Sequence, residues 1–126
     1  REAVALPVIA KGEVWSVAGW RAIRAASGCD DVMLGRGAVA DPLLVERIRG
    51  ARAEAPEAAD WRELQSLIAD FWGQVLAKLE ARHAPGRLKQ WLGLLRRNYA
   101  GAEALYCHAR ELGSVAAIGA ALRWRQ

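Results

Sequence analysis

The sequence predicts a mainly α fold, in which two strand–helix units precede an all-α four-helix bundle. Two observations lead to this prediction. Residues 1–50 contain two short apolar runs separated by a stretch with helix caps, which is typical of parallel strands joined by a crossover helix. Residues 51–126 keep a helical period throughout. We therefore expect two domains, 1–50 and 51–126.

The first domain begins with a nearly continuous apolar run at residues 4–10, which predicts a strand buried on both faces. Ser16 is a suitable N-cap for a helix to about residue 26, and Ser27-Gly28 should end that helix. A second short buried strand is expected at residues 31–34. Because two parallel strands do not form a stable sheet alone, we expect this segment to be the end of a larger α/β domain.

After the second strand, residues 35–37 (Gly-Arg-Gly) predict a turn. Asp41-Pro42 then supplies an N-cap and a first-turn proline for a helix that ends near Gly50. Further on, Asp60 with Glu63 three residues later has the spacing of a capping box and predicts the start of a long amphipathic helix to about residue 79.

The residues Ala84-Pro85-Gly86 are expected to break the long helix. Three more helices are expected at residues 87–99, 102–112 and 114–124, with Gly113 ending the second and Ser114 capping the third. Short turns between four helices indicate a compact antiparallel bundle.

The expected helix at 87–99 combines an apolar seam with a basic face. At about 100° per residue, Lys89 and Arg96 stand together beside the seam, and Gly93 lies on the opposite, free side between Lys89 and Arg97. The small Gly93 would leave room for a sugar–phosphate backbone. The seam consists of Leu88, Trp91, Leu92, Leu95 and Tyr99.

Positive charge is concentrated in the second part of the chain. The formal net charge is +4, and residues 1–44 hold as many acidic as basic side chains, so the excess lies beyond them. No Asp or Glu occurs between Glu80 and Glu103. Clustered Lys and Arg attract phosphates, so nucleic acid is the leading partner and an anionic membrane the second choice. The alternative is an ordinary solvated helix face.

The sequence lacks the patterns of a membrane-spanning segment and of a metal site. The chain has no uninterrupted apolar stretch long enough to span a bilayer and no leader-like start, so we expect a cytoplasmic protein. Cys29 and Cys107 are isolated and form no metal-ligand spacing, so we expect neither a disulfide framework nor a metal site. His83 and His108 are assigned no role.

Three stretches resemble the last part of a tRNA-dihydrouridine synthase, closest to the bacterial subfamily C. They are LPVIAKGEVW at 6–15, SGCDDVMLGRGA at 27–38 and RLKQWL at 87–92. The first two are shared with other flavin-binding barrels, whereas the third belongs to the helical domain of this family. The resemblance implies that residues 1–50 are the last two strand–helix units of a (β/α)₈ TIM barrel, followed by a helical tRNA-binding domain at 51–126.

The resemblance also implies a cofactor, flavin mononucleotide (FMN), whose phosphate would contact the turns at Gly12 and at Gly35-Arg36. Loops after the last strands of such barrels commonly bind a phosphate. Lys11 stands where the family usually has Asn; its ammonium can pair with a phosphate but cannot both donate and accept as an amide does. The alternative is that these glycines merely allow tight turns.

The implied reaction is reduction of a tRNA uridine to 5,6-dihydrouridine by the reduced flavin, with NADPH as the reductant of the intact parent and a cysteine as general acid. That cysteine sits in an earlier part of the barrel, so neither Cys29 nor Cys107 is assigned as catalytic. Cys107 is expected to be a small core residue. We expect the fragment alone to be inactive and to bind FMN weakly.

The resemblance implies that the helical domain binds tRNA. We expect Arg87, Lys89, Arg96 and Arg97 to make the contacts, and helix geometry places Lys89 and Arg96 together. The tryptophans fit apolar seams, with Trp124 alone left open for base stacking.

Two other functions remain open. The chain could be a stand-alone basic helical interaction module, or a fragment of another flavin-binding TIM-barrel oxidoreductase such as a dihydroorotate dehydrogenase. Open strand edges in the truncated barrel would favour self-association.

Overall fold

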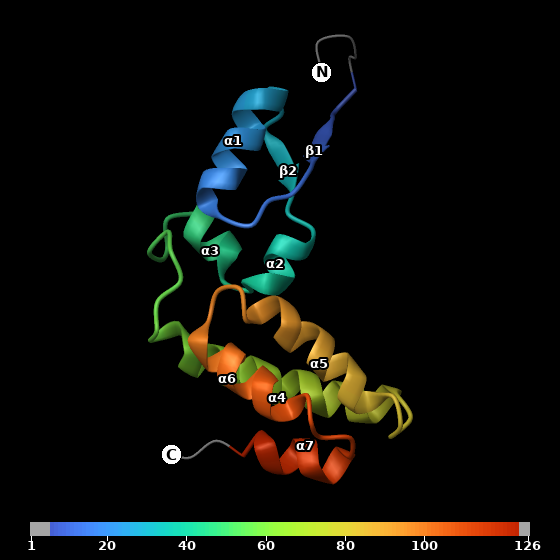
Figure 1. Ribbon diagram of the computed structural model, residues 1–126. Coiled ribbons are helices and arrows are strands. Elements are labelled where there is room, and N and C mark those ends of the chain that lie inside the picture. Colours follow the sequence, from blue (N-terminus) through green and yellow to red (C-terminus); the bar gives the residue numbers. More distant parts are fainter. Residues whose placement is uncertain (1–5, 124–126) are drawn as a thin grey trace. The chain divides into compact units, whose positions relative to one another are not determined.

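The computed structural model describes residues 6–123 and is mainly helical, with two short parallel strands (Figure 1). The chain folds as two compact units, Arg1–Pro56 and Glu57–Gln126. The division falls six residues later than the expected boundary at residue 50, so residues 51–56 belong to the first unit.

The first unit contains a parallel β–α–β arrangement. Strand β1 (Ile9–Lys11) pairs with β2 (Asp31–Met33) in the register Ile9↔Asp31, and α1 (Val17–Ser27) connects them. The caps of α1 confirm the sequence-based prediction. The Ser16 hydroxyl accepts a hydrogen bond from the Gly19 N–H at 3.1 Å, and Gly28 ends the helix with φ +69°.

The strands are shorter and more open than their apolar sequences predict. Helix α1 packs against both strands, yet Ile9 remains 61% exposed and Met33 50% exposed. The expectation of strands buried on both faces is therefore wrong for the described part of this chain, and residues 4 and 5 lie outside it. One face of a two-stranded sheet has no second layer to cover it.

Two short helices complete the first unit. Helix α2 (Arg36–Ala40) begins within the turn expected at residues 35–37, and α3 (Leu44–Ile48) follows it. Asp41 does initiate α3, but through a turn: its carboxylate accepts from the Leu43 N–H at 3.1 Å, and the helix begins two residues later than Pro42.

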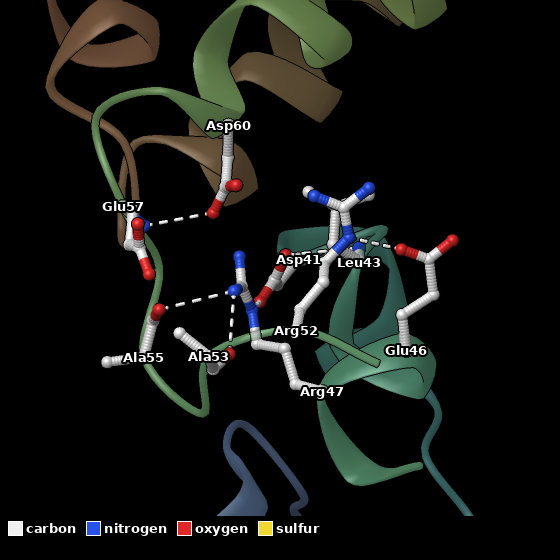
Figure 2. A network of polar contacts seen from close by, with 9 residues as sticks. All are labelled: Asp41, Leu43, Glu46, Arg47, Arg52, Ala53, Ala55, Glu57 and Asp60. Carbon is white, nitrogen blue, oxygen red and sulfur yellow. Dashed lines mark hydrogen bonds and ion pairs between the residues drawn. The ribbon is translucent and has the colours of Figure 1, made fainter. Parts of the chain in front are cut away.

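A buried ion pair holds the end of the first unit (Figure 2). The Arg47 Nε donates to the Asp41 carboxylate at 2.8 Å, and the two side chains are 1% and 3% exposed. The Arg47 Nη1 also donates to the carbonyls of Ala53 and Ala55, at 3.0 and 3.2 Å. These bonds tie residues 53–55 to α3, so the first unit extends past residue 50.

The second unit contains α4 (Asp60–Lys78), α5 (Ala84–Leu95), α6 (Ala100–Ala109) and α7 (Val115–Ala121). Helix α5 packs against each of the other three (Figure 1). Its predicted apolar seam is confirmed as core, since Leu88, Leu92 and Leu95 are fully buried. The core also contains Leu64, Ile68, Trp72, Tyr99, Leu105 and Ile118.

The predicted long amphipathic helix is confirmed, because α4 runs from Asp60 to Lys78. Its predicted capping box is wrong: Asp60 is the first residue of α4, and its carboxylate accepts from the upstream Glu57 N–H at 2.9 Å. Pro85 lies in the first turn of α5, where its missing N–H costs nothing. The break between the two helices therefore lies before residue 84, not at Ala84-Pro85-Gly86.

The helix expected to reach residue 99 ends at Leu95, and the extended backbone of Tyr99 starts α6 instead. The prediction that Ser114 caps the last helix is confirmed, because its hydroxyl accepts from the Ala117 N–H at 3.1 Å.

Candidate functional site

A cavity of about 510 Å³ opens where β1 and β2 end. Parallel pairing places the carboxyl ends of both strands at one edge, so the turns that follow them come together. All four residues predicted for the cofactor line this cavity, namely Lys11, Gly12, Gly35 and Arg36. Helix α2 begins directly beneath it, and the N–H groups of Gly35 and Arg36 have no backbone acceptor within residues 6–123.

Two glycines of this cavity are required by the backbone itself. Gly35 has φ +59° and ψ −131°, a conformation that costs free energy for any residue with a Cβ. A Cβ on Gly37 would lie 1.5 Å from the Val14 carbonyl oxygen, so the loop after β1 rests directly on α2. Gly12 is less constrained, because a Cβ there would meet only the flexible end of Ile23 at 2.7 Å.

The charged side chains of the cavity lie at its rim. The Arg36 guanidinium is 3.5 Å from the Glu13 carboxylate and 5.4 Å from the centre of the Trp15 ring, and its side chain is 68% exposed. Lys11 is exposed as well. The cavity therefore carries two cations and one carboxylate, a balance that favours an anionic ligand.

Sequence reasoning missed Glu13, Trp15 and Gly37 as members of this site. The signal for Gly37 was present, because a second glycine one residue after Gly35-Arg36 is typical of close backbone packing. Nothing in the sequence alone places Glu13 and Trp15 against Arg36.

The predicted RNA-binding residues differ in burial and in ion pairing. Arg87 is exposed near the start of α5 and Lys89 is half-buried, and neither side chain is ion-paired among the described residues. Arg97 is exposed in the turn after α5, outside the helix on which it was expected.

Arg96 is held by α6. Its guanidinium makes a bidentate ion pair with Glu103, with Nη2 2.7 Å from Oε1, and its centre lies 4.3 Å from the middle of the Tyr106 ring. The hydrogen bond that Arg96 donates to Glu103 is the main reason why the pKa of Arg96 is raised, and the same bond lowers the pKa of Glu103. Arg96 thus presents little net charge.

The side of α5 that carries Gly93 is not free, and that prediction is wrong. A Cβ on Gly93 would lie 3.8 Å from Tyr106, so this side faces α6. The periodicity of one helix cannot show which of its polar sides a neighbouring helix covers.

The two cysteines occupy different settings. Cys29 is buried just before β2, and its thiol donates to the Ser27 carbonyl at 3.9 Å. Cys107 is exposed on α6, 3.5 Å from Glu103, so the expectation that it is a core residue is wrong. Trp124 lies outside the described residues.

Within residues 6–123, no cluster of three His, Cys, Asp or Glu side chains has the arrangement of a metal site. None of the described helices combines the length and apolar character needed to cross a bilayer.

Comparison with known proteins gives a consistent result. Residues 1–96 match the family described as "Dihydrouridine synthase (Dus)". The chain is 52% identical over 111 residues to a tRNA-dihydrouridine(16) synthase of Aquipseudomonas alcaligenes, covering 87% of this chain and 35% of that protein. The like-named protein of Ralstonia nicotianae is 46% identical, covering 93% of the chain and 36% of that protein. The chain therefore spans about a third of the length of these curated relatives.

Proposed function

The chain belongs to the dihydrouridine synthase family, and from this premise we propose that it serves as the C-terminal part of a tRNA-dihydrouridine synthase. In this role the first unit supplies the turns that hold the cofactor phosphate, and the second unit grips tRNA. The observation that carries the proposal is the meeting of Gly12 and Gly35-Arg36, two turns 23 residues apart in the chain, in one cavity.

The residues of the cavity fit the phosphate end of a flavin. Backbone N–H groups at the start of α2 and the guanidinium of Arg36 are the donors that a phosphate needs, and Gly35 keeps that backbone accessible. We propose FMN as the flavin, with Gly12, Gly35 and Arg36 as its phosphate contacts. Lys11 would add charge at the rim without a fixed geometry.

The flavin would supply the hydride that reduces the C5–C6 double bond of a uridine, and NADPH is the proposed reductant of the flavin. The names of the relatives point to uridine 16 of tRNA as the substrate. The chain's own residues would bind the flavin phosphate and orient the tRNA. Neither cysteine is proposed as the acid, since Cys29 lies at the other end of β2 from the cavity and Cys107 lies in the second unit.

The proposal explains why Ile9 and Met33 are exposed in this chain. We propose that β1 and β2 are the last two strands of a (β/α)₈ barrel, in which further strands would cover the open face. In the chain alone, this face favours self-association.

The second unit is the proposed tRNA-binding part, through Arg87, Lys89, Arg96 and Arg97. Contacts of this kind go to phosphates and fix the register of the RNA without reading its sequence. Because Arg96 is already paired with Glu103, the larger contributions are expected from Arg87 and Lys89.

The test is binding of tRNA to the chain over a series of salt concentrations. Arg87→Ala with Lys89→Ala should flatten the slope of log affinity against log salt by somewhat under two units. The control is Arg62→Ala with Arg110→Ala, which removes two positive charges at exposed positions of α4 and of the end of α6. Equal affinity of the wild-type chain for tRNA and for heparin would contradict the proposal and favour a general polyanion-binding module.

A further inference from the structure

We propose that the groove between the end of α4 and the start of α5 binds one unpaired nucleobase of a single-stranded RNA segment, with Lys78 and Arg87 holding the flanking phosphates. This proposal rests on the tRNA-binding function proposed above and specifies which part of an RNA this surface takes.

The groove is a defined hollow of about 250 Å³ in the second unit. Four of its lining residues repeat at the spacing of one helix face, and they come from the last three turns of α4. Arg87 completes it from the first turns of α5, which packs against α4. The lining residues are Phe71, Gln74, Val75, Lys78, Leu79 and Arg87.

The wall of the groove is apolar, aromatic and held in place. The Phe71 ring makes an edge contact with the Trp91 ring, with centroids 4.8 Å apart, so its position is set before any ligand arrives. Leu67, one turn earlier on the same face, is 40% exposed and extends the apolar surface. An aromatic, apolar wall is the surface on which unstacked bases of single-stranded RNA pack.

The charges of the groove select its occupant. Its lining contains two cations and no carboxylate, and neither Lys78 nor Arg87 is ion-paired among residues 6–123. The acidic residue of the following turn, Glu80, is engaged by Arg82 at 2.8 Å. An apolar peptide would leave both cations without a partner, whereas a nucleotide joins a flat apolar base to an anionic phosphate.

Gln74 gives the groove a further polar group. Its side chain is exposed at the lining, and an amide presents both a donor and an acceptor to the edge of a base. Replacing this amide by a carboxylate changes almost no volume and places a negative charge beside Lys78 and Arg87.

The experiment measures binding of the chain to a short oligouridylate and to an RNA duplex of equal charge. Gln74→Glu should weaken binding of the oligouridylate on the order of tenfold and leave the duplex much less affected. The control is Gln65→Glu, the same change on the opposite side of α4, which should alter neither affinity by more than about twofold. An oligouridylate that carries 4-thiouridine should photocrosslink to a residue of the groove.

Two results would overturn the groove without contradicting the proposed function, and a third would contradict both. If Gln74→Glu and Gln65→Glu weaken both RNAs equally, only general charge is at work and tRNA binding still stands. If Gln74→Glu instead abolishes binding to phosphatidylglycerol vesicles and not to RNA, the groove belongs to a lipid surface. If the wild-type chain binds no RNA, both proposals fail together.

Discussion

The two units hold their candidate sites in place by different means. In the first, the cavity is lined by backbone turns, and the unit contains a buried ion pair, Arg47–Asp41, whose side chains are 1% and 3% exposed. In the second, the candidate surface consists of side chains on helices, and its ion pair, Arg96–Glu103, is 36% and 45% exposed. Substitutions should therefore have large structural effects in the first unit and graded, salt-dependent effects in the second.

The largest effect is expected from Arg47→Met. This change removes the guanidinium that pairs with the buried Asp41 carboxylate and binds the carbonyls of Ala53 and Ala55, so it should cost about 3–5 kcal/mol of unfolding free energy. Urea unfolding measures the cost, and hydrogen exchange of residues 31–55 locates it.

The matched control is Arg52→Met, which removes the same type of side chain from a pair with Glu46 that is partly exposed. Its cost should stay below about 1 kcal/mol. Equal losses for the two variants would show that the burial of Asp41–Arg47 does not distinguish the units.

A smaller effect is expected from Gly37→Ala. The added Cβ would meet the Val14 carbonyl at 1.5 Å, so the loop after β1 must move away, at a cost of about 1–3 kcal/mol. Gly73→Ala is the control in the second unit: nothing lies within 4 Å of a Cβ there, and an alanine within α4 should stabilise by roughly 0.5–1 kcal/mol. A tolerated Gly37→Ala would contradict the contact between loop and helix.

Glu103→Gln tests whether the exposed pair screens the RNA surface. It releases Arg96 from its carboxylate, so tRNA binding should strengthen at low salt and the salt slope should steepen by up to roughly one unit. Unchanged binding would show that the side of α5 facing α6 does not contribute to the RNA surface. The combination of Glu103→Gln with Arg96→Ala is the control, which should cancel the gain.

The smallest effect is the pH dependence of that pair. The Arg96 hydrogen bond lowers the pKa of Glu103 in the folded chain, so its contribution to stability is present at neutral pH and is lost as the pH falls through that lowered pKa. The stability difference between wild type and Glu103→Gln should therefore shrink on acidification below the ordinary glutamate value of about 4.3. A difference that stays constant over this range would contradict the pairing.

The helix caps, the strand-end turns and the apolar seam could be predicted from the sequence, because each depends on residues close together in the chain. Ser16, Gly28 and Ser114 act as caps through neighbours within four residues, and parallel strands bring the turns at Gly12 and Gly35 together wherever the rest of the chain lies. The apolar seam of α5 is equally local.

What the sequence does not predict depends on contacts between distant segments. From the sequence, Arg47 is indistinguishable from an exposed residue on a helix surface. In the structure it donates hydrogen bonds to Asp41 and to two backbone carbonyls. Arg96 reads as a free cation because Glu103 lies seven residues away, beyond a helix end that the pattern does not reveal. Charge surfaces are therefore harder to predict than backbone turns, because one neighbour can neutralise them.

We propose above all that this chain supplies a dihydrouridine synthase with the turns that bind the cofactor phosphate and with a tRNA-binding surface. The most direct measurement replaces the matching third of the Aquipseudomonas alcaligenes relative with this chain and assays dihydrouridine at position 16 of an unmodified tRNA. We expect the chimera to retain flavin and form dihydrouridine, and to lose tRNA affinity but not flavin with Arg87→Ala and Lys89→Ala. A folded chimera that retains flavin yet neither binds tRNA nor forms dihydrouridine would contradict the claim.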